Sequence, residues 1–206
     1  EGPLYVPGAP LSQGQARLDD DGTDEGDTLV MHGRVLGTNG APVAGAIVDV
    51  WHANTLGNYS YFDPSQTAYN NRRRIAADAQ GRYKFRSIVP SGYAVPPQGA
   101  TETLLGAIGR HGNRPAHIHF FVSAAGHRHL TTQINISGDP YLYDDFAQAT
   151  REGLIPAIVR HEDPVSIRNE GLTMPFFEIE FDFILHASHD PADTSAHARP
   201  RVSAAT

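Results

Sequence analysis

Two histidines separated by one residue, His117 and His119, lie in the segment RPAHIHFF. If this segment is a β-strand, their side chains project from the same face, while Ile118 and Phe120 face the opposite way. Both imidazoles would then point into one cavity, an arrangement that a metal ion can use. A histidine pair on a strand can also line a solvated face, so the motif alone leaves both interpretations open.

The chain contains no cysteine, which excludes disulfides, thiolate zinc sites, iron–sulfur clusters and cysteine nucleophiles. Carboxylates or phenolates must therefore complete any metal shell around the histidines. Two tyrosines, Tyr59 in NYS and Tyr93 in PSGY, lie where predicted strands end in loops. A phenol is deprotonated at neutral pH only beside a strong Lewis acid such as Fe(III). Because a tyrosine is more often a packed ring than a ligand, the role of these phenols also stays open.

The charge of the chain argues against a nucleic-acid partner. Its 206 residues have a formal net charge of −7, and the basic residues form no extended run beyond residues 72–74. No apolar stretch approaches the roughly 18 to 20 residues of a membrane span, and the first twenty residues lack a signal-peptide pattern. We therefore expect a cytoplasmic protein without a membrane span.

Short apolar or alternating runs punctuated by 20 glycines and 15 prolines predict a mainly β fold, a β-sandwich with short helices and long loops. The dipeptide Asn39-Gly40 favours a tight turn, and we expect a hairpin between the strands on either side of it. Two short helices are predicted at 101–109 and 143–152, each with acidic residues near its start. The predicted strands are 28–37, 42–52, 82–89, 116–124, 129–137 and 176–184.

One domain is expected over residues 1–186, because a chain of this length can bury one large core. Residues 187–206 are rich in Ala, Ser, Asp and Pro, and they offer few large apolar side chains to offset the entropy of ordering. We expect this tail to be flexible. The sequence opens without an initiator methionine, which is typical of a fragment.

Several separated runs resemble the intradiol ring-cleavage dioxygenase family. They are GPLYVPGAP, GAIVDVWHANTLGNYSYFD, YNNRRRIAAD, GRYKFRSIVPSGY and GRHGNRPAHIHFFVSAAGHRHLTTQINISGDPYLYDDFAQATREGL. They cover nearly all of residues 1–185 in the family order, so the resemblance is specific, and they look most like the members that act on catechol. The resemblance implies a β-sandwich oxidoreductase that uses Fe(III) and O2 to open a catechol ring between its hydroxyl carbons, giving cis,cis-muconate.

The resemblance also implies roles for individual residues. The iron ligands that it implies are Tyr59, Tyr93, His117 and His119. Tyr93 would in addition be catalytic, because it leaves the metal and takes a proton when the substrate binds. The residues that it implies for substrate binding are Pro3, Leu4, Arg114, Gln133, Phe146 and Ala147.

Arg114 precedes the first histidine on what reads as one continuous strand segment. Period-two geometry is expected to direct its guanidinium toward the face of the imidazoles. A cation there can stabilise negative charge that develops on the substrate ring, which makes Arg114 a candidate catalytic residue. The alternative is an ordinary surface charge on a strand.

Four other histidines receive no metal role. His127 and His129 repeat the same spacing, but they flank a glycine turn and match no ligand of the family. His52 and His111 match none either. We expect all four to be structural or exposed.

Other functions stay open beside this one. Chlorocatechol and hydroxyquinol dioxygenases share the implied ligand set, although the runs GHRHLTTQINI and DDFAQATREGL look closer to the catechol enzymes. A non-catalytic β-sandwich binding module would need no iron. The family's N-terminal helical region, which builds the dimer interface and part of the substrate pocket, is absent from this sequence. A homodimer is therefore expected only when that region is present.

Overall fold

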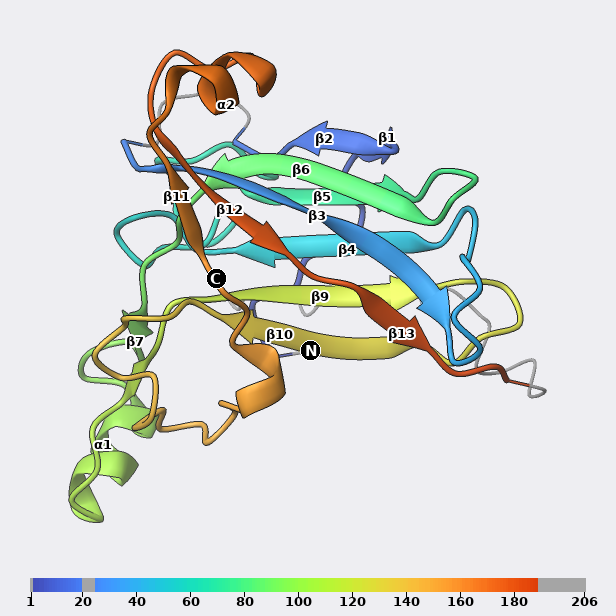
Figure 1. The fold of residues 1–206 in the computed structure, drawn as a ribbon. Coiled ribbons are helices and arrows are strands. Elements are labelled where there is room, and N and C mark those ends of the chain that lie inside the picture. Colours follow the sequence, from blue (N-terminus) through green and yellow to red (C-terminus); the bar gives the residue numbers. More distant parts are fainter. Residues whose placement is uncertain (1, 20–24, 189–206) are drawn as a thin grey trace.

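A computed structural model describes residues 2–19 and 25–188. Over these residues two sheets pack face to face, with short helices and long loops around them (Figure 1). This arrangement confirms the β-sandwich predicted from the sequence.

The strands and helices are short apart from one ten-residue strand. The first half of the chain comprises β1 (Leu11–Gln13), β2 (Gln15–Arg17), β3 (Thr28–Gly37), β4 (Ile47–His52), β5 (Arg72–Ala76), β6 (Arg82–Ile88) and β7 (Tyr93–Ala94). The second half comprises α1 (Ala100–Ala107), β8 (Asn113–Arg114), β9 (His117–Ser123), β10 (Leu130–Asn135), η1 (Glu152–Leu154), β11 (Val159–His161), α2 (Pro164–Asn169), β12 (Phe176–Glu180) and β13 (Phe183–Leu185).

The first sheet has the strand order β1-β5-β4-β9-β10, and the second has the order β11-β12-β3-β6-β2. The short strand β13 also pairs with β3, and β7 and β8 form a separate two-stranded ladder. Strand β9 lies between β4 and β10 and is antiparallel to both. It is therefore held on both edges, which fixes the direction of each of its side chains.

The core lies between the two sheets. Because side chains alternate along a strand, Ile118 and Phe120 of β9 point inward and are fully buried. They meet Phe85 of β6, whose ring centroid is 6.4 Å from that of Phe120. Burial of each such side chain contributes about 1.5–3 kcal/mol. His119, which lies between them, faces away from this core.

The Asn39-Gly40 turn forms, but the predicted hairpin is wrong. Gly40 adopts a positive φ of 77°, and an isolated bridge joins Leu36 to Pro42. Beyond the turn the chain crosses over, because β3 belongs to the second sheet and β4 to the first. The apolar faces of these two strands meet across the core, and this burial decides against their pairing edge to edge.

The predicted helix at 143–152 is also wrong, since helical geometry appears only at its end, in η1. The carboxylate of Asp145 accepts hydrogen bonds from the backbone N–H groups of Ala147 (3.1 Å) and Ala149 (3.1 Å). Gln148 has a positive φ of 51°. These local bonds compete with a helix and fold the segment into a loop.

The predicted strand at 176–184 is divided into β12 and β13. The break lies at Phe181 and Asp182, where the carbonyl of Phe181 accepts a hydrogen bond from the Tyr83 hydroxyl (2.7 Å). A Cβ on Gly33 would lie 1.9 Å from that carbonyl oxygen. The glycine therefore permits the close approach of the chain at this break.

The helix predicted at 101–109 is present as α1, which projects from the sandwich (Figure 1). None of its residues is buried, and Leu104 is 69% exposed. The predicted flexible tail lies outside the described residues except for 187–188, where Ala187 forms a bridge with His127. The boundary at residue 186 stays a prediction.

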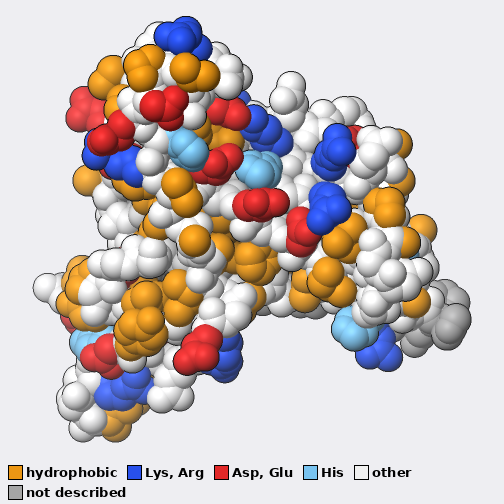
Figure 2. Space-filling model, in the orientation of Figure 1, with side chains coloured by type: hydrophobic (Ala, Val, Ile, Leu, Met, Phe, Trp, Pro, Cys, Tyr) orange, Lys and Arg blue, Asp and Glu red, His pale blue; other side chains and the backbone are white. Residues whose placement is uncertain are grey.

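On the face shown in Figure 2, acidic, basic and histidine side chains are interspersed and form no field of one sign. This agrees with the absence of an extended basic run in the sequence. Among residues 2–19 and 25–188, no helix is both long enough and apolar enough to span a membrane.

Candidate metal centre

Strand β9 presents His117 and His119 on its outer face, opposite to the core residues. The two rings are nearly perpendicular, with centroids 4.6 Å apart. Their Nε2 atoms are 3.0 Å apart. Both imidazoles therefore direct the same nitrogen toward one point, as the alternation of the strand predicts.

The structure fixes the tautomer of His117. Its Nδ1 donates a hydrogen bond to the carbonyl of Pro115 (2.6 Å), which leaves the lone pair on Nε2. Burial, followed by the charge of Arg114, lowers the pKa of His117 to about 3. Burial and then His117 hold the pKa of His119 well below its usual value. Both rings are thus neutral at neutral pH, which is the form that binds a metal.

The two candidate phenols lie beside these imidazoles. The rings of Tyr59 and Tyr93 are perpendicular, with centroids 5.5 Å apart. The Tyr93 ring is 5.5 Å from His117, and the Tyr59 ring is 6.4 Å from His119. The structure thus brings together all four residues that the family resemblance implies as ligands.

Two glycines allow the loops that carry these phenols to touch. Gly57 has a positive φ of 79°, and a Cβ there would lie 2.8 Å from the carbonyl oxygen of Gly92. A Cβ on Gly92 would in turn lie 2.6 Å from the carbonyl oxygen of Arg114. Larger residues at these positions would separate Tyr59 from Tyr93.

The Tyr59 hydroxyl is a buried polar group without a hydrogen-bond partner. Burial, and next the neighbouring Tyr93, raises its pKa well above the usual value. The guanidinium of Arg72 lies 5.8 Å from the centre of its ring and donates to Ser60 (2.8 Å). A buried oxygen of this kind needs an explanation, and a bound cation supplies one.

Carboxylates do not provide the missing ligands. Among the described residues, no three His, Asp or Glu side chains gather into a group that could hold a metal ion. The donors available at this point are therefore two imidazole nitrogens and two phenol oxygens. Hard oxygen donors combined with imidazoles suit a highly charged cation, and ferric iron fits this set.

Arg114 reaches the site by a route that differs from the prediction. It lies on β8 and pairs with Tyr93 of β7, and Pro115 and Ala116 separate it from β9. On one continuous strand, its odd separation from His117 would have directed it to the opposite face. The break in the strand allows its Nη1 to lie 3.1 Å from His117 Nε2.

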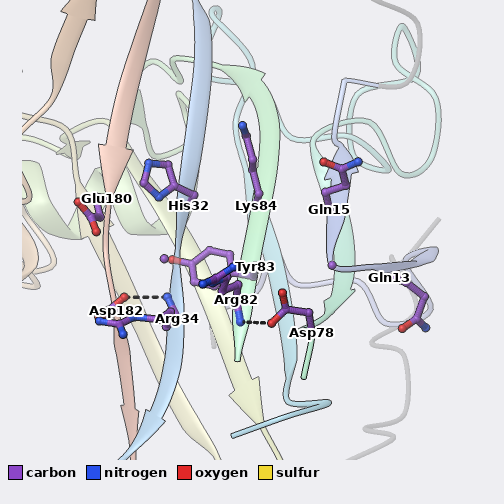
Figure 3. A pocket seen from close by; sticks show the side chains of 12 residues that line it. Gln13, Gln15, His32, Arg34, Asp78, Arg82, Tyr83, Lys84, Glu180 and Asp182 are labelled. Carbon is purple, nitrogen blue, oxygen red and sulfur yellow. Dashed lines mark hydrogen bonds and ion pairs between the residues drawn. The ribbon is translucent and has the colours of Figure 1, made fainter. Parts of the chain in front are cut away.

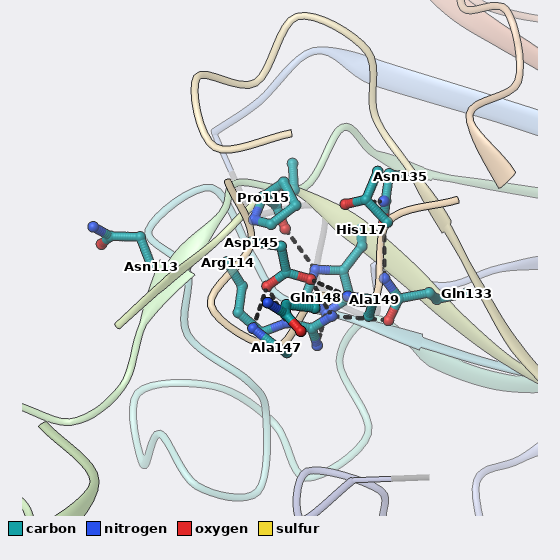
Figure 4. A network of polar contacts seen from close by, with 12 residues as sticks. Asn113, Arg114, Pro115, His117, Gln133, Asn135, Asp145, Ala147, Gln148 and Ala149 are labelled. Atoms are coloured by element: carbon teal, nitrogen blue, oxygen red, sulfur yellow. Dashed lines mark hydrogen bonds and ion pairs between the residues drawn. The ribbon is translucent and has the colours of Figure 1, made fainter. Parts of the chain in front are cut away.

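A network of polar contacts holds the Arg114 guanidinium (Figure 4). Its Nε and Nη2 donate to the two oxygens of Asp145 at 3.1 and 3.2 Å. Nη2 also donates to Gln133 Oε1 at 3.0 Å. The sequence pointed to Gln133 only through the family resemblance, and it did not single out Asp145 for the site.

The residues that the resemblance implies as walls of the substrate pocket differ in their burial. Leu4 packs against the apolar group formed by Trp51, Tyr59 and Phe121. Phe146 follows Asp145 and is partly buried, with its N–H bonded to a carbonyl beside Arg114. The other two implied wall residues, Pro3 and Ala147, are exposed. The roles of these residues toward a substrate stay predictions.

The four histidines that were expected to have no metal role make other contacts. His52 is buried, and its Nε2 lies 2.7 Å from Ser87 Oγ. The Nε2 atom of His111 lies 3.0 Å from a carboxylate oxygen of Asp144. The ring of His129 packs against an aromatic ring at 5.0 Å, and His127 lies 3.0 Å from a carbonyl. These contacts agree with the expectation that all four are structural or exposed.

A groove of about 710 Å³ lies on the outer face of the second sheet, on the opposite side of the sandwich (Figure 3). Two of its basic residues already have acidic partners. Arg34 pairs with Asp182 at 3.0 Å, and Lys84 pairs with Glu170 at 2.6 Å. The hydroxyl of Tyr83 is bonded to a backbone carbonyl. This groove therefore gives no indication of the chemistry of a ligand.

Comparisons with known proteins show what this chain is similar to. Residues 1–187 match the family model described as "Dioxygenase". The chain is 70% identical over 162 residues to "Catechol 1,2-dioxygenase 2" of Acinetobacter lwoffii, covering 79% of this chain and 58% of the relative. It is 54% identical over 205 residues to "Catechol 1,2-dioxygenase" of Acinetobacter baylyi, covering 98% of this chain and 66% of the relative.

The solved structure of catechol 1,2-dioxygenase from Pseudomonas arvilla C-1 has the same fold, with a TM-score of 0.92 and 57% sequence identity. That match covers 98% of this chain and 65% of the solved chain. This chain therefore spans somewhat less than two thirds of the length of these three relatives.

Proposed function

Because this chain belongs to the intradiol ring-cleavage dioxygenase family, we propose that it opens the ring of catechol between its two hydroxyl carbons with O2, forming cis,cis-muconate. The observation that carries the proposal is the meeting of Tyr59, Tyr93, His117 and His119 at one point on the outer face of the first sheet. The activity belongs to the relatives as whole proteins, and it is extended to this chain as a proposal.

We propose that these four residues hold Fe(III). Two observations support this. The buried Tyr59 hydroxyl has no hydrogen-bond partner, and the two neutral imidazoles direct their Nε2 atoms toward the same point. Two phenolates and two neutral imidazoles would leave a ferric centre with a net charge of about +1, which one hydroxide neutralises. When bound, the ferric ion would supply a Lewis acid that makes the catechol ring reactive toward O2.

The two phenols differ in exposure, and this difference suggests different roles. Tyr59 is 4% exposed and enclosed by its neighbours, whereas Tyr93 is partly exposed. Tyr59 would remain a fixed anchor. The oxygen of Tyr93 is the one that an incoming diol can reach, and it would accept a proton from the substrate hydroxyl.

Arg114 would stabilise negative charge on the substrate. Its Nε and Nη2 donate hydrogen bonds to Asp145 and Gln133. Nη1 is therefore the nitrogen that faces the imidazole Nε2 atoms. An N–H donor held in place in a buried site stabilises developing charge more effectively than one in water. Leu4 and Phe146, with Pro3 and Ala147 at the exposed rim, would contact the ring of the substrate.

Unsubstituted catechol is the substrate that we favour. The curated relatives named for catechol are 46% to 70% identical to this chain. Those named for chlorocatechol and hydroxyquinol are 37% and 38% identical. Rates on a panel of catechol, chlorocatechols and hydroxyquinol decide between these substrates.

Three further proposals rest on the sequence. The catalytic domain comprises residues 1–186. The protein is a homodimer when the helical region that precedes this domain in the family is present. Its location is cytoplasmic.

The visible spectrum of the iron-loaded chain tests the proposed function. We expect a charge-transfer band from tyrosinate to Fe(III), a shift of this band when catechol is added without oxygen, and muconate once oxygen is admitted. A semialdehyde product would indicate that the ring opens beside the two hydroxyl carbons and not between them. A colourless, zinc-containing protein that forms no muconate would contradict the proposal and favour a non-catalytic binding module.

A further inference from the structure

Asp145 is a buried carboxylate that receives hydrogen bonds from two directions. Its side chain is 1% exposed. The guanidinium of Arg114 approaches side-on, with one N–H donor for each oxygen, at 3.1 and 3.2 Å. On the opposite side, the backbone N–H groups of Ala147 and Ala149 each donate to one oxygen at 3.1 Å. The carboxylate therefore connects the loop to the arginine.

A chain of amide hydrogen bonds closes a ring around this pair. Gln133 accepts from Arg114 Nη2 through Oε1, so its Nε2 is free to donate to Asn135 Oδ1 at 2.8 Å. Asn135 Nδ2 then donates to Thr150 Oγ1 at 3.0 Å. Thr150 belongs to the same loop as Asp145, so the ring ties β8, β10 and this loop together. Arginine can only donate, so Gln133 must accept with its oxygen, and this choice fixes the direction of the hydrogen bonds that follow.

The ring directs one nitrogen of the guanidinium, Nη1, toward His117. Arginine has five N–H donors in a planar fork, and the contacts with Asp145 and Gln133 use Nε and Nη2. The third nitrogen, Nη1, is not used by these two residues. It lies 3.1 Å from His117 Nε2, in the candidate metal centre. Rotation of the fork would direct a different edge to this point.

We propose that Asp145 is a positioning residue, which fixes the Arg114 fork so that Nη1 faces the substrate. This inference rests on the proposed function, since it concerns the charge that develops on the bound ring. Asp145 acts through Arg114 and touches no reacting atom. A small displacement of a catalytic group can cost on the order of a hundredfold in rate.

The substitution Asp145→Asn tests this role, because it keeps the shape and replaces one acceptor oxygen by an N–H group that faces Arg114. We expect kcat to fall by about 10- to 100-fold, with KM changed by less than about threefold and iron content unchanged. The variant Asp145→Glu retains the carboxylate and is expected to recover part of the lost kcat. A kcat equal to that of the parent chain in Asp145→Asn would overturn the proposal.

A double-mutant cycle separates positioning from a general effect on the fold. In a chain that already carries Arg114→Ala, Asp145→Asn is expected to lower kcat by no more than about twofold, because the group through which it acts is gone. An undiminished loss in that background would mean that Asp145 acts by another route. Turnover is taken per folded, iron-loaded chain, since the single change Arg114→Ala leaves a buried carboxylate unpaired.

Asp78 provides a matched control. Its Oδ1 accepts the backbone N–H groups of Gln80 and Arg82 at 2.8 Å in an exposed turn, so it holds a loop as Asp145 does but lies outside the site. Asp78→Asn is expected to leave kcat and KM unchanged. A comparable loss of kcat in this variant would attribute the effect of Asp145→Asn to loop stability.

A measurement that needs no turnover keeps the proposal separate from the proposed function. If the parent chain formed no muconate, the proposed function would be wrong. Hydrogen exchange at Arg114 Nε, measured by nuclear magnetic resonance, would still show whether the guanidinium is held in place. We expect this N–H to exchange slowly in the parent chain and in Asp78→Asn, and rapidly in Asp145→Asn. Rapid exchange in the parent chain would overturn the proposal.

Discussion

Trp51 and His119 lie face to face on neighbouring strands, with ring centroids 4.9 Å apart and 9° between the ring planes. Tyr5 and Phe121 pack edge-on against the same indole, at 4.9 and 4.8 Å. The indole is therefore held in place, and it limits rotation of the imidazole. Groups that orient a metal-binding histidine commonly contribute to metal affinity.

The substitution Trp51→Phe is expected to weaken iron binding by about tenfold or more, because the His119 ring loses much of its stacking surface. Competition with a chelator of known affinity measures the loss. Phe85→Leu is the control, since it removes a core aromatic ring on the opposite sheet and should reduce stability without affecting iron. Iron affinity in Trp51→Phe equal to that of the parent chain would show that the stack has no such role.

Tyr59→Phe is expected to separate stability from metal binding. In the iron-free chain it removes a buried hydroxyl without a partner, so the free energy of unfolding in urea should stay the same or rise by up to about 1 kcal/mol. The same variant should fail to retain iron after dialysis. A drop of more than about 1 kcal/mol in the iron-free chain would mean that the hydroxyl has a structural partner.

Arg114→Ala is expected to keep iron and the visible band but to lose about 100- to 1000-fold in kcat, because the donor that faces the substrate is removed. His119→Ala should instead lose the iron itself. Metal analysis and turnover on the same samples distinguish the two outcomes. Normal turnover by Arg114→Ala would exclude a charge-stabilising role.

Gly92→Ala is expected to disturb the candidate metal centre through the backbone. Its Cβ would lie 2.6 Å from Arg114 O and 3.0 Å from Asp139 Oδ2, so the turn that carries Tyr93 must shift. We expect a loss of about 1–3 kcal/mol in stability and weaker iron binding. Gly106→Ala in α1 is the control, because its Cβ would meet no atom within 4 Å, and it should stabilise the helix by up to about 1 kcal/mol.

Asp49 should make the stability of the chain depend on pH. Burial raises the pKa of its carboxyl from 3.8 to about 6, although Tyr5 donates a hydrogen bond to it. The folded state thus holds this proton more tightly than the unfolded state, so the charged form destabilises the fold increasingly between pH 3.8 and 6. At pH 7 the cost amounts to about 3 kcal/mol at most.

Asp49→Asn is therefore expected to gain stability over the parent chain at pH 7, and to lose this advantage as the pH falls to 4. Asn keeps an oxygen that can accept the bond from the Tyr5 hydroxyl. Urea unfolding of both proteins across this range measures the difference. A difference that does not change with pH would contradict the raised pKa.

The sequence predicted well those features that depend on local alternation. The pattern around Ile118 and Phe120 gives both the strand and its two faces, so the outward direction of His117 and His119 followed directly. The meeting of these imidazoles with Tyr59 did not follow from any local pattern. Only the resemblance between separated runs connected the distant loops.

Other features depend on partners that are distant in the chain. The three-residue strands β1 and β2 exist because they pair in parallel with β5 and β6, and such short runs carry little signal of their own. At Asp145, acidic residues near the start of the segment favoured a helix, but the contact with Arg114 favoured a loop. Propensity is a weak guide where a buried side chain has a specific partner.

Strand β9 carries the metal-binding candidates on one side and the hydrophobic interior on the other. A slip of a single position against β4 would drive both imidazoles into the interior and expose Ile118 and Phe120 to water. A misaligned chain would therefore lose both the proposed metal site and its solubility. Uptake of the proposed iron would therefore report on correct strand alignment during refolding, before any turnover is measured.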